Sequence, residues 1–295
     1  MSEVAEFNLA AATQAPVPGA RRRRGGHVMI LAVVLGLAWI VPFYYAVVTV
    51  FKSTSDYASG GPLSLPHAIA PIIGNVVAAW QQTQMGTGMA NSLGYGVFGA
   101  GAAVFFAAMA AYALARIVFP GRPAWFMLIF SGTIFPFQIY LIPLFQMYAR
   151  VGLFNTRFGL LLAYIAICIP FPTLVLKNYM AEIPRELDEA ARIDGGTHPR
   201  IFASIILPNC IGPLVALFLL QFTWIWNDLI FSMVLTQDTS RRSVMNTLMV
   251  FQGNYAGSTP NLVITAAVLA SLPTVLVFLV LRRYFMQGLS LSTAR

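Results

Sequence analysis

The sequence carries little charge. Only 9% of its 295 residues are Asp, Glu, Lys or Arg, whereas 58% are hydrophobic, and the mean hydropathy is +0.73. Apolar runs of about 20 residues recur along the chain, and this is the length that an α-helix needs to cross a bilayer. The composition therefore excludes an ordinary soluble domain and predicts an all-α membrane protein.

Residue types that carry chemistry are also scarce. The two cysteines, Cys168 and Cys210, lie at or within apolar segments and have no metal-ligand or disulfide spacing. The three histidines, His27, His67 and His198, are scattered. No Gly-x-x-x-x-Gly-Lys-Ser/Thr loop is present, so the chain lacks this route to ATP binding. We predict no catalytic residue, no metal site and no cofactor, and expect a subunit that is not an enzyme.

Six apolar segments are long enough to span a membrane: residues 28–50, 91–115, 124–148, 157–178, 209–236 and 261–284. They define a transmembrane domain over residues 28–288, between an N-terminal tail, residues 1–27, and a C-terminal tail, residues 289–295. A further apolar stretch, residues 68–80, is too short to span and is expected to form an interfacial or periplasmic helix. A polar loop, residues 179–208, separates the fourth and fifth segments.

The basic residues predict the orientation. With the N-terminus in the cytoplasm, thirteen of the eighteen Lys and Arg residues fall on the cytoplasmic side, as the positive-inside rule requires. Both termini and the polar loop are then cytoplasmic. Four consecutive arginines, residues 21–24, precede the first segment; they could form a nucleic-acid patch, but their position favours a topology anchor, so no nucleic-acid partner is expected.

The polar loop contains five of the ten acidic residues between positions 182 and 194. Pro184 suits a first helical turn, and Gly195-Gly196 suits a helix end. Pro199 favours an extended residue before it, so a second helix is expected to start near His198. Leu187, Ala190 and Ala191 share one face of the first helix, and this small apolar face suits docking on another protein.

Glu189-Ala190-Ala191, followed at fixed spacing by Gly195, Ile205 and Leu207-Pro208, resembles the EAA signature of ABC-importer permeases. The resemblance implies a type I importer permease fold with six transmembrane helices, whose cytoplasmic coupling helix docks on an ATPase. The alternative is a polar loop that merely joins two membrane helices. The residues expected to dock are Glu189, Ala190, Ala191, Asp194, Gly195, Ile205, Leu207 and Pro208.

Other stretches resemble sugar-importer permeases of the maltose-transporter type, among them Pro136-Phe137-Gln138 in the third segment and Trp224-Ile225-Trp226-Asn227 in the fifth. Two prolines, Pro136 and Pro143, predict a broken third helix, which is tolerated where it is buried or lines a cavity. Residues of a possible pathway or gate are Gln138, Trp226, Asn227 and Asp228. For Gln138 an interhelical hydrogen bond is the alternative. For Asp228 a role in helix packing or at the outer gate is favoured over direct contact with a sugar.

The resemblance implies a subunit of an ATP-driven, binding-protein-dependent importer in a bacterial plasma (inner) membrane, translocating a sugar. Its implied partners are two ABC ATPase subunits, a second homologous permease, an extracytoplasmic solute-binding protein and membrane lipid. Import of another small solute is an alternative. A proton-coupled secondary transporter is a further one, but it would need ionisable residues near the membrane midplane, and the sequence offers none that is convincing.

Overall fold

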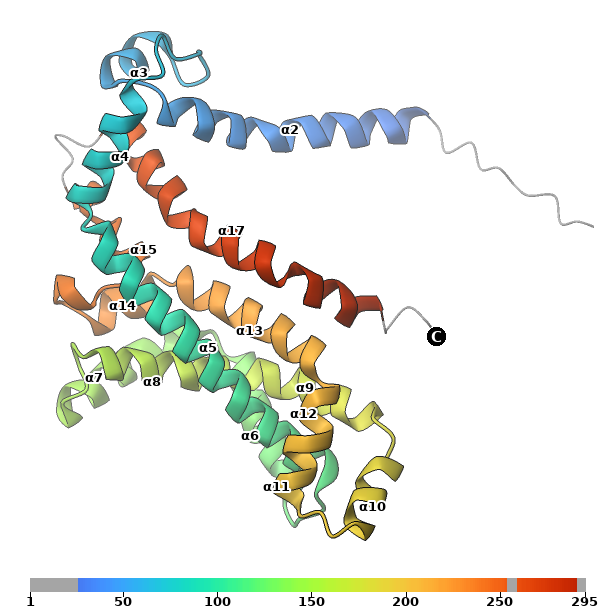
Figure 1. Cartoon of the computed structure of the whole chain (residues 1–295). Coiled ribbons are helices and arrows are strands. Elements are labelled where there is room, and N and C mark those ends of the chain that lie inside the picture. The colour runs from blue at the N-terminus through green and yellow to red at the C-terminus, as the bar shows by residue number, and fades with distance from the viewer. Residues whose placement is uncertain (1–25, 254–258, 291–295) are drawn as a thin grey trace, which may run out of the picture. The chain divides into compact units, whose positions relative to one another are not determined.

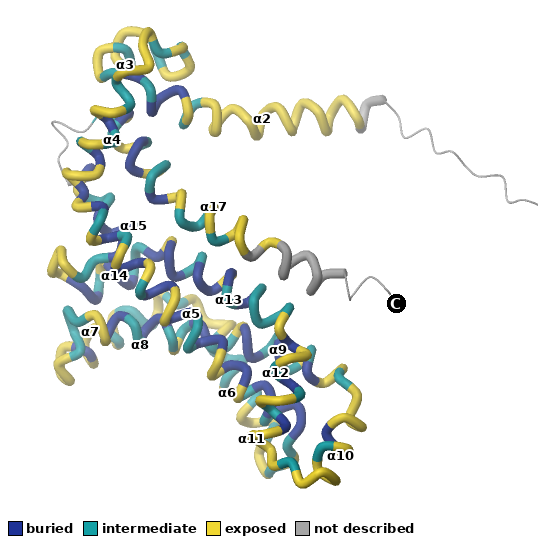
Figure 2. The backbone as a smooth tube through the Cα atoms, viewed as in Figure 1, coloured by how far each residue is buried: buried dark blue, intermediate teal, exposed yellow. Residues whose placement is uncertain are grey.

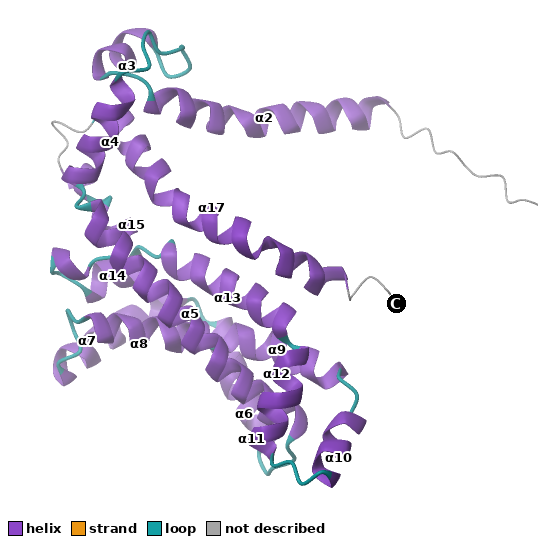
Figure 3. Ribbon diagram, viewed as in Figure 1, coloured by secondary structure: helices purple, strands orange, loops and turns teal. Residues whose placement is uncertain are grey.

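A computed structural model describes residues 26–253 and 259–290. All regular elements within these two ranges are helices (Figure 3), which confirms the all-α prediction. The chain divides into two compact units, residues 1–47 and 48–295. The described part of the first unit belongs to α2 (Gly26–Val50), an apolar helix that continues unbroken past Pro42 and matches the first predicted segment.

The second unit is organised around α5 (Met85–Arg116), a helix of 32 residues. It packs against α8 (Arg157–Cys168), α9 (Pro170–Glu182) and α13 (Ile211–Trp226) (Figure 1). Much of α5 is buried, in contrast to α10 (Glu186–Ile193), the first helix of the polar loop (Figure 2).

Small residues on α5 permit this close packing. A Cβ atom added to Gly96 would lie 2.7 Å from the ring of Phe222, and one added to Gly99 would lie 3.0 Å from Ile225. A larger side chain at either position would push α13 away from α5.

Among the described residues, three helices are individually long and apolar enough to cross a membrane: Met29–Val50 of α2, α5, and Pro260–Val280 of α17 (Pro260–Ser290). Three bent pairs meet the same test together: Arg122–Ile134 with Phe137–Val151 at 97°, Arg157–Cys168 with Pro170–Glu182 at 41°, and His198–Asn209 with Ile211–Trp226 at 79°. Counting each pair as one span gives up to six, the predicted number.

The sequence predicted the helix break in the third segment but not the one in the fifth. The third segment breaks between α6 (Arg122–Ile134) and η1 (Phe137–Tyr140), at Pro136, as its prolines predicted. The fifth segment, expected as one helix over residues 209–236, ends instead at Trp226 and resumes as α14 (Ile230–Leu235). The second segment begins earlier than expected, at Met85. The short apolar stretch forms α4 (Pro71–Gln82).

The remaining helices of the second unit are short. They are α3 (Thr54–Gly60), α7 (Leu141–Val151), α10 (Glu186–Ile193), α11 (His198–Ile201), the π-helical η2 (Phe202–Ile206), α12 (Leu207–Asn209), η3 (Thr239–Arg241), α15 (Val244–Thr247) and α16 (Val250–Gly253).

Candidate functional site

The first helix of the polar loop, α10, begins at Glu186, two residues after Pro184. It ends in a Schellman turn: the Gly195 N–H donates to Arg192 O at 3.0 Å and the Gly196 N–H donates to Ala191 O at 2.8 Å. Gly195 has φ +79°, a conformation that side chains with a Cβ rarely adopt, and a Cβ on Gly196 would lie 2.6 Å from Ala191 O. Both glycines are therefore required by the backbone.

The second helix starts at His198, as predicted, but the extended residue is the N-cap Thr197, and His198 itself, expected to be extended before Pro199, is helical. The helix passes from α11 into the π-helical turn η2 and then α12. Pro208 has no N–H, so the carbonyl of Ser204 loses its ordinary helical donor, and a wider turn forms in which the Leu207 N–H donates to Phe202 O. Ile205 and Leu207 are half-buried, whereas Pro208 is exposed.

One face of α10 lies open. Leu187 and Ile193 are 42% and 88% exposed, and Ala190 between them is exposed too. Ala191, expected on the same face, is instead half-buried and packs on the chain's own apolar cluster. The signature carboxylate Glu189 is exposed, and its side chain makes no hydrogen bond or ion pair within the described residues. Asp194 is also exposed.

The opposite face of α10 carries a buried ion pair that the sequence did not reveal. Arg116, at the end of α5, has its Nη1 atom 3.5 Å from Asp188 Oδ2, and the two side chains are only 2% and 8% exposed. They border a pocket of about 290 Å³ together with Glu189, Arg192 and other polar residues. Arg116 is one of the thirteen basic residues that predict the orientation, and Asp188 is one of the five acidic residues of the polar loop. No local sequence pattern pairs residues so far apart.

The break after α13 gathers the predicted gate residues. Trp226 is 1% exposed, and its indole Nε1–H donates to Ala270 O on α17 at 2.9 Å. Asn227 is exposed, and its side chain donates to Thr223 O at 2.8 Å. Trp226 therefore joins two membrane helices, while Asn227 ends one of them.

Asp228 is buried and accepts three hydrogen bonds. The donors are the Tyr164 hydroxyl at 2.8 Å, the Ser232 N–H at 3.1 Å and the Phe231 N–H at 3.3 Å. This carboxyl group thus caps α14 and ties it to α8. Beside it lies a largely apolar pocket of about 830 Å³, which Asn227 and Asp228 border.

Gln138 lies in η1, and its side chain is exposed and makes no hydrogen bond within the described part of the chain. The interhelical hydrogen bond considered for Gln138 is therefore not observed there. Its neighbour Phe137 packs against Trp224 and Phe231, with ring centroids 5.7 and 5.6 Å apart.

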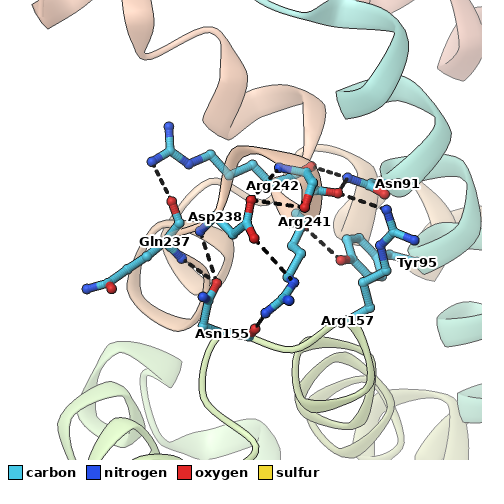
Figure 4. A network of polar contacts seen from close by, with 9 residues as sticks. Asn91, Tyr95, Asn155, Arg157, Gln237, Asp238, Arg241 and Arg242 are labelled. Carbon is cyan, nitrogen blue, oxygen red and sulfur yellow. Dashed lines mark hydrogen bonds and ion pairs between the residues drawn. The ribbon is translucent and has the colours of Figure 1, made fainter.

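A third polar cluster joins the start of α5 and the α7–α8 turn to residues 237–242 (Figure 4). We call it the outer-loop network because the predicted orientation places residues 237–242 outside the membrane. The Asn155 side-chain oxygen accepts from the N–H groups of Gln237 and Asp238, each at 3.0 Å. The Ser240 N–H and hydroxyl both donate to Asp238; these bonds hold the pKa of the Asp238 carboxyl below its ordinary value. Arg241 donates to the Asn155 carbonyl. These hydrogen bonds fix the conformation of the segment, although residues 237–240 are exposed and residues 241–242 only half-buried.

The helical membrane fold, the broken spans and the polar loop together define an integral membrane subunit of a transport system. The family model described as "Binding-protein-dependent transport system inner membrane component" matches residues 103–291. The chain belongs to this family.

Curated relatives extend over most of the chain. This chain is 32% identical to the melibiose/raffinose/stachyose import permease of Bacillus subtilis (strain 168), in an alignment that covers 89% of this chain and 94% of the relative. It is 30% identical to the diacetylchitobiose uptake permease of Streptomyces coelicolor, covering 87% and 84%. It is 29% identical to an osmoprotective-compound uptake permease of Synechocystis, covering 89% of each.

Among solved structures, the chain resembles a chain of a bacterial ABC transporter that imports the acidic polysaccharide alginate. The TM-score is 0.75 and the identity 24%, over 88% of this chain and 96% of that one. The likeness confirms the fold of an ABC-importer permease.

Proposed function

We propose that this chain is the permease subunit of an ATP-driven importer that carries a sugar, a mono- or oligosaccharide, into the cytoplasm. Support for a sugar comes from relatives whose names refer to melibiose, raffinose and stachyose, to diacetylchitobiose, and to alpha-glucosides. Import of another small solute is the competing substrate class, and it is distinguished by the uptake experiment below.

The proposed partners are two ABC ATPase subunits, a second homologous permease and an extracytoplasmic solute-binding protein. The observation that carries this proposal is the open face of α10, where Leu187, Ala190 and Ile193 are exposed beside a Glu189 carboxylate that pairs with no residue of ranges 26–253 and 259–290. An apolar strip beside a free charge suits a groove with a basic residue at its rim. The proposed docking residues are Glu189, Ala190, Ala191, Asp194, Gly195, Ile205, Leu207 and Pro208.

In this arrangement the polar loop, the N-terminal tail and the C-terminal tail face the cytoplasm of a bacterial plasma membrane. ATP-driven closure of the ATPase pair moves α10, and the spans switch between inward-open and outward-open packings that differ by a few kcal/mol. Gln138 and Asn227, whose side chains are exposed, are proposed to line the pathway. Trp226 and Asp228 are proposed to hold the outer gate in shape.

Capture of the ATPase tests the docking proposal. The tagged chain is purified from detergent-solubilised membranes as wild type, Glu189→Lys and Glu182→Lys. Glu182 is also exposed but precedes α10, so it is the matched control. We expect the ATPase and a second permease to co-purify with wild type and with Glu182→Lys, and the ATPase to be depleted from Glu189→Lys. Purification of the wild-type chain alone would refute the proposal.

Uptake tests the substrate class. Vesicles that contain the complete transporter are supplied with radiolabelled melibiose, raffinose, maltose or diacetylchitobiose, and with radiolabelled methionine as the non-sugar comparison. ATP-dependent accumulation of one of the sugars, reduced by Glu189→Lys, is the expected result. Accumulation of methionine with none of the sugars would favour the other substrate class while leaving the docking proposal intact.

A further inference from the structure

Helix α5 makes polar contacts with functional segments at both of its ends. Its 32 residues run without proline or any break, a length of about 48 Å at 1.5 Å per residue. The Arg116 end contacts the polar loop, and the end near Asn91 contacts the outer-loop network. A single continuous helix therefore links the candidate ATPase-docking loop to residues 237–242.

At the polar-loop end, α5 holds both loop helices. Arg116 donates from Nη2 to Ile183 O at 2.6 Å, just before α10, and pairs with Asp188 within α10. One helical turn earlier, the Tyr112 hydroxyl shares a hydrogen bond of 3.1 Å with His198 Nδ1, at the start of α11. Because Tyr112 and Arg116 are four residues apart, they lie on one face of α5, so the loop is anchored at two points.

The Arg116–Asp188 pair is poorly suited to a purely stabilising role. The Nε and Nη1 atoms of Arg116 and the Oδ1 atom of Asp188 are buried and have no hydrogen-bond partner in the part of the chain that the structure describes. Removing charges from water is costly, and buried ion pairs with incomplete hydrogen bonding are often no more stabilising than apolar pairs of similar size. Such a pair does, however, define the direction and distance between the two helices, which an apolar contact does not.

At its other end, α5 holds the backbone of the outer-loop network. The Asn91 amide donates to Ser240 O at 2.9 Å and to Arg242 O at 3.0 Å, and the Tyr95 hydroxyl donates to Arg241 O at 2.8 Å. A shift of α5 along its axis would therefore move this segment with it.

We propose that Arg116 and Asp188 are positioning residues that couple α10 to α5, and that α5 transmits movement of the polar loop to residues 239–242. The proposal rests on the importer function proposed above. In this proposal the ATPase moves α10, the buried Arg116–Asp188 pair moves α5, and the side chains of Asn91 and Tyr95 move residues 239–242.

The experiment measures the accessibility of residue 239, beside one end of α5, while nucleotide binds to the ATPase at the polar-loop end. Thr239 is exposed, and the chain's two own cysteines are buried, so Thr239→Cys provides one reactive thiol. The complete complex, purified with its ATPase and placed in lipid nanodiscs, is labelled with a polar maleimide with and without a non-hydrolysable ATP analogue. The labelling rates are compared for Arg116→Met, Asp188→Leu and the double variant. Arg150→Gln and Glu182→Gln, at exposed positions, are the controls.

We expect nucleotide to change the labelling rate at position 239 severalfold in the unmodified background and in both controls, and to have no effect in the three test variants. Each single variant leaves one buried charge unpaired and should lower the thermal stability of the complex, whereas the double variant should regain it. A purely structural pair would regain the nucleotide response together with stability. Loss of the response in a stable, ATPase-bound double variant is therefore the diagnostic result.

Two outcomes would overturn this inference alone: a double variant that responds as the unmodified background does, or an ATPase-bound background whose position 239 ignores nucleotide. Absence of the ATPase from the wild-type preparation would instead refute the importer function on which the inference rests. The amount of captured ATPase, measured in every sample, distinguishes the two failures.

Discussion

Replacing Asp228 with alanine removes the acceptor of three hydrogen bonds in the interior of the helix bundle. The Tyr164 hydroxyl and the N–H groups of Phe231 and Ser232 would all lose their partner. A buried donor left unpaired costs roughly 1–3 kcal/mol, and the bond from Phe231 is long. We therefore expect Asp228→Ala to lower the free energy of unfolding by about 3–6 kcal/mol.

Two further variants separate the contributions of the individual hydrogen bonds to this loss of stability. Asp228→Asn keeps the shape and one acceptor oxygen, so a loss of about 1–2 kcal/mol is expected. Tyr164→Phe removes one donor only, with a similar expected loss of about 1–2 kcal/mol. Asn227→Ala is the matched control because its exposed side chain bonds only within its own helix, and its stability should stay close to that of wild type.

Unfolding of the purified chain by SDS in mixed micelles, followed by tryptophan fluorescence, measures these differences. Stability of Asp228→Ala equal to that of Asn227→Ala would refute the capping role. A second outcome concerns the transport mechanism. Wild-type stability of Asp228→Asn together with a loss of uptake would favour the ion-coupled transporter, in which this carboxyl group must change its protonation state.

Three other perturbations have defined outcomes. Gly96→Val should cost about 1–3 kcal/mol in the same unfolding assay because its side chain meets an α13 ring 2.7 Å away, whereas Gly94→Val, with open space around it, should not. Gly195→Val places a side chain at φ +79°, costing about 1–2 kcal/mol, and should reduce ATPase capture. The Ser240 donors lower the pKa of Asp238 below its ordinary value of 3.8, so the contribution of its carboxylate to the stability of residues 237–242 is present above that pH and lost as the pH falls further. Protease cleavage within residues 236–243 should therefore rise on acidification, and Asp238→Asn should remove this dependence.

The polar loop could be predicted well because its shape is determined locally. Gly195 and Gly196 end α10 through backbone geometry that only neighbouring residues set, and His198 begins the next helix beside Pro199. The break at Pro136 was predicted for the same reason, since proline removes a donor wherever it stands. Features that follow from one residue and its neighbours can be recognised in a single sequence.

The break after Trp226 could not be predicted in this way. Residues 227–229 contain neither proline nor glycine, and the apolar run continues beyond them. The helix ends because Asp228 turns its carboxyl group to the N–H groups of α14 and to Tyr164, which lies 64 positions earlier. Residue types alone do not specify a partner at such a distance, so the sequence favoured one continuous helix.

The buried charged groups Asp228 and Arg116 both hold helices together in this structure. An ionisable residue within an apolar segment is first considered as part of a transport path, and a basic residue at the end of a segment as a mark of topology. In the structure Asp228 accepts hydrogen bonds that hold α14 against α8, and Arg116 holds α10 against α5. Both groups lie where a helix meets an element that is distant in sequence. At such junctions a directional polar contact fixes the relative position of two helices. A transporter that works by moving helices depends on these fixed contacts as much as on the polar residues that line its pathway.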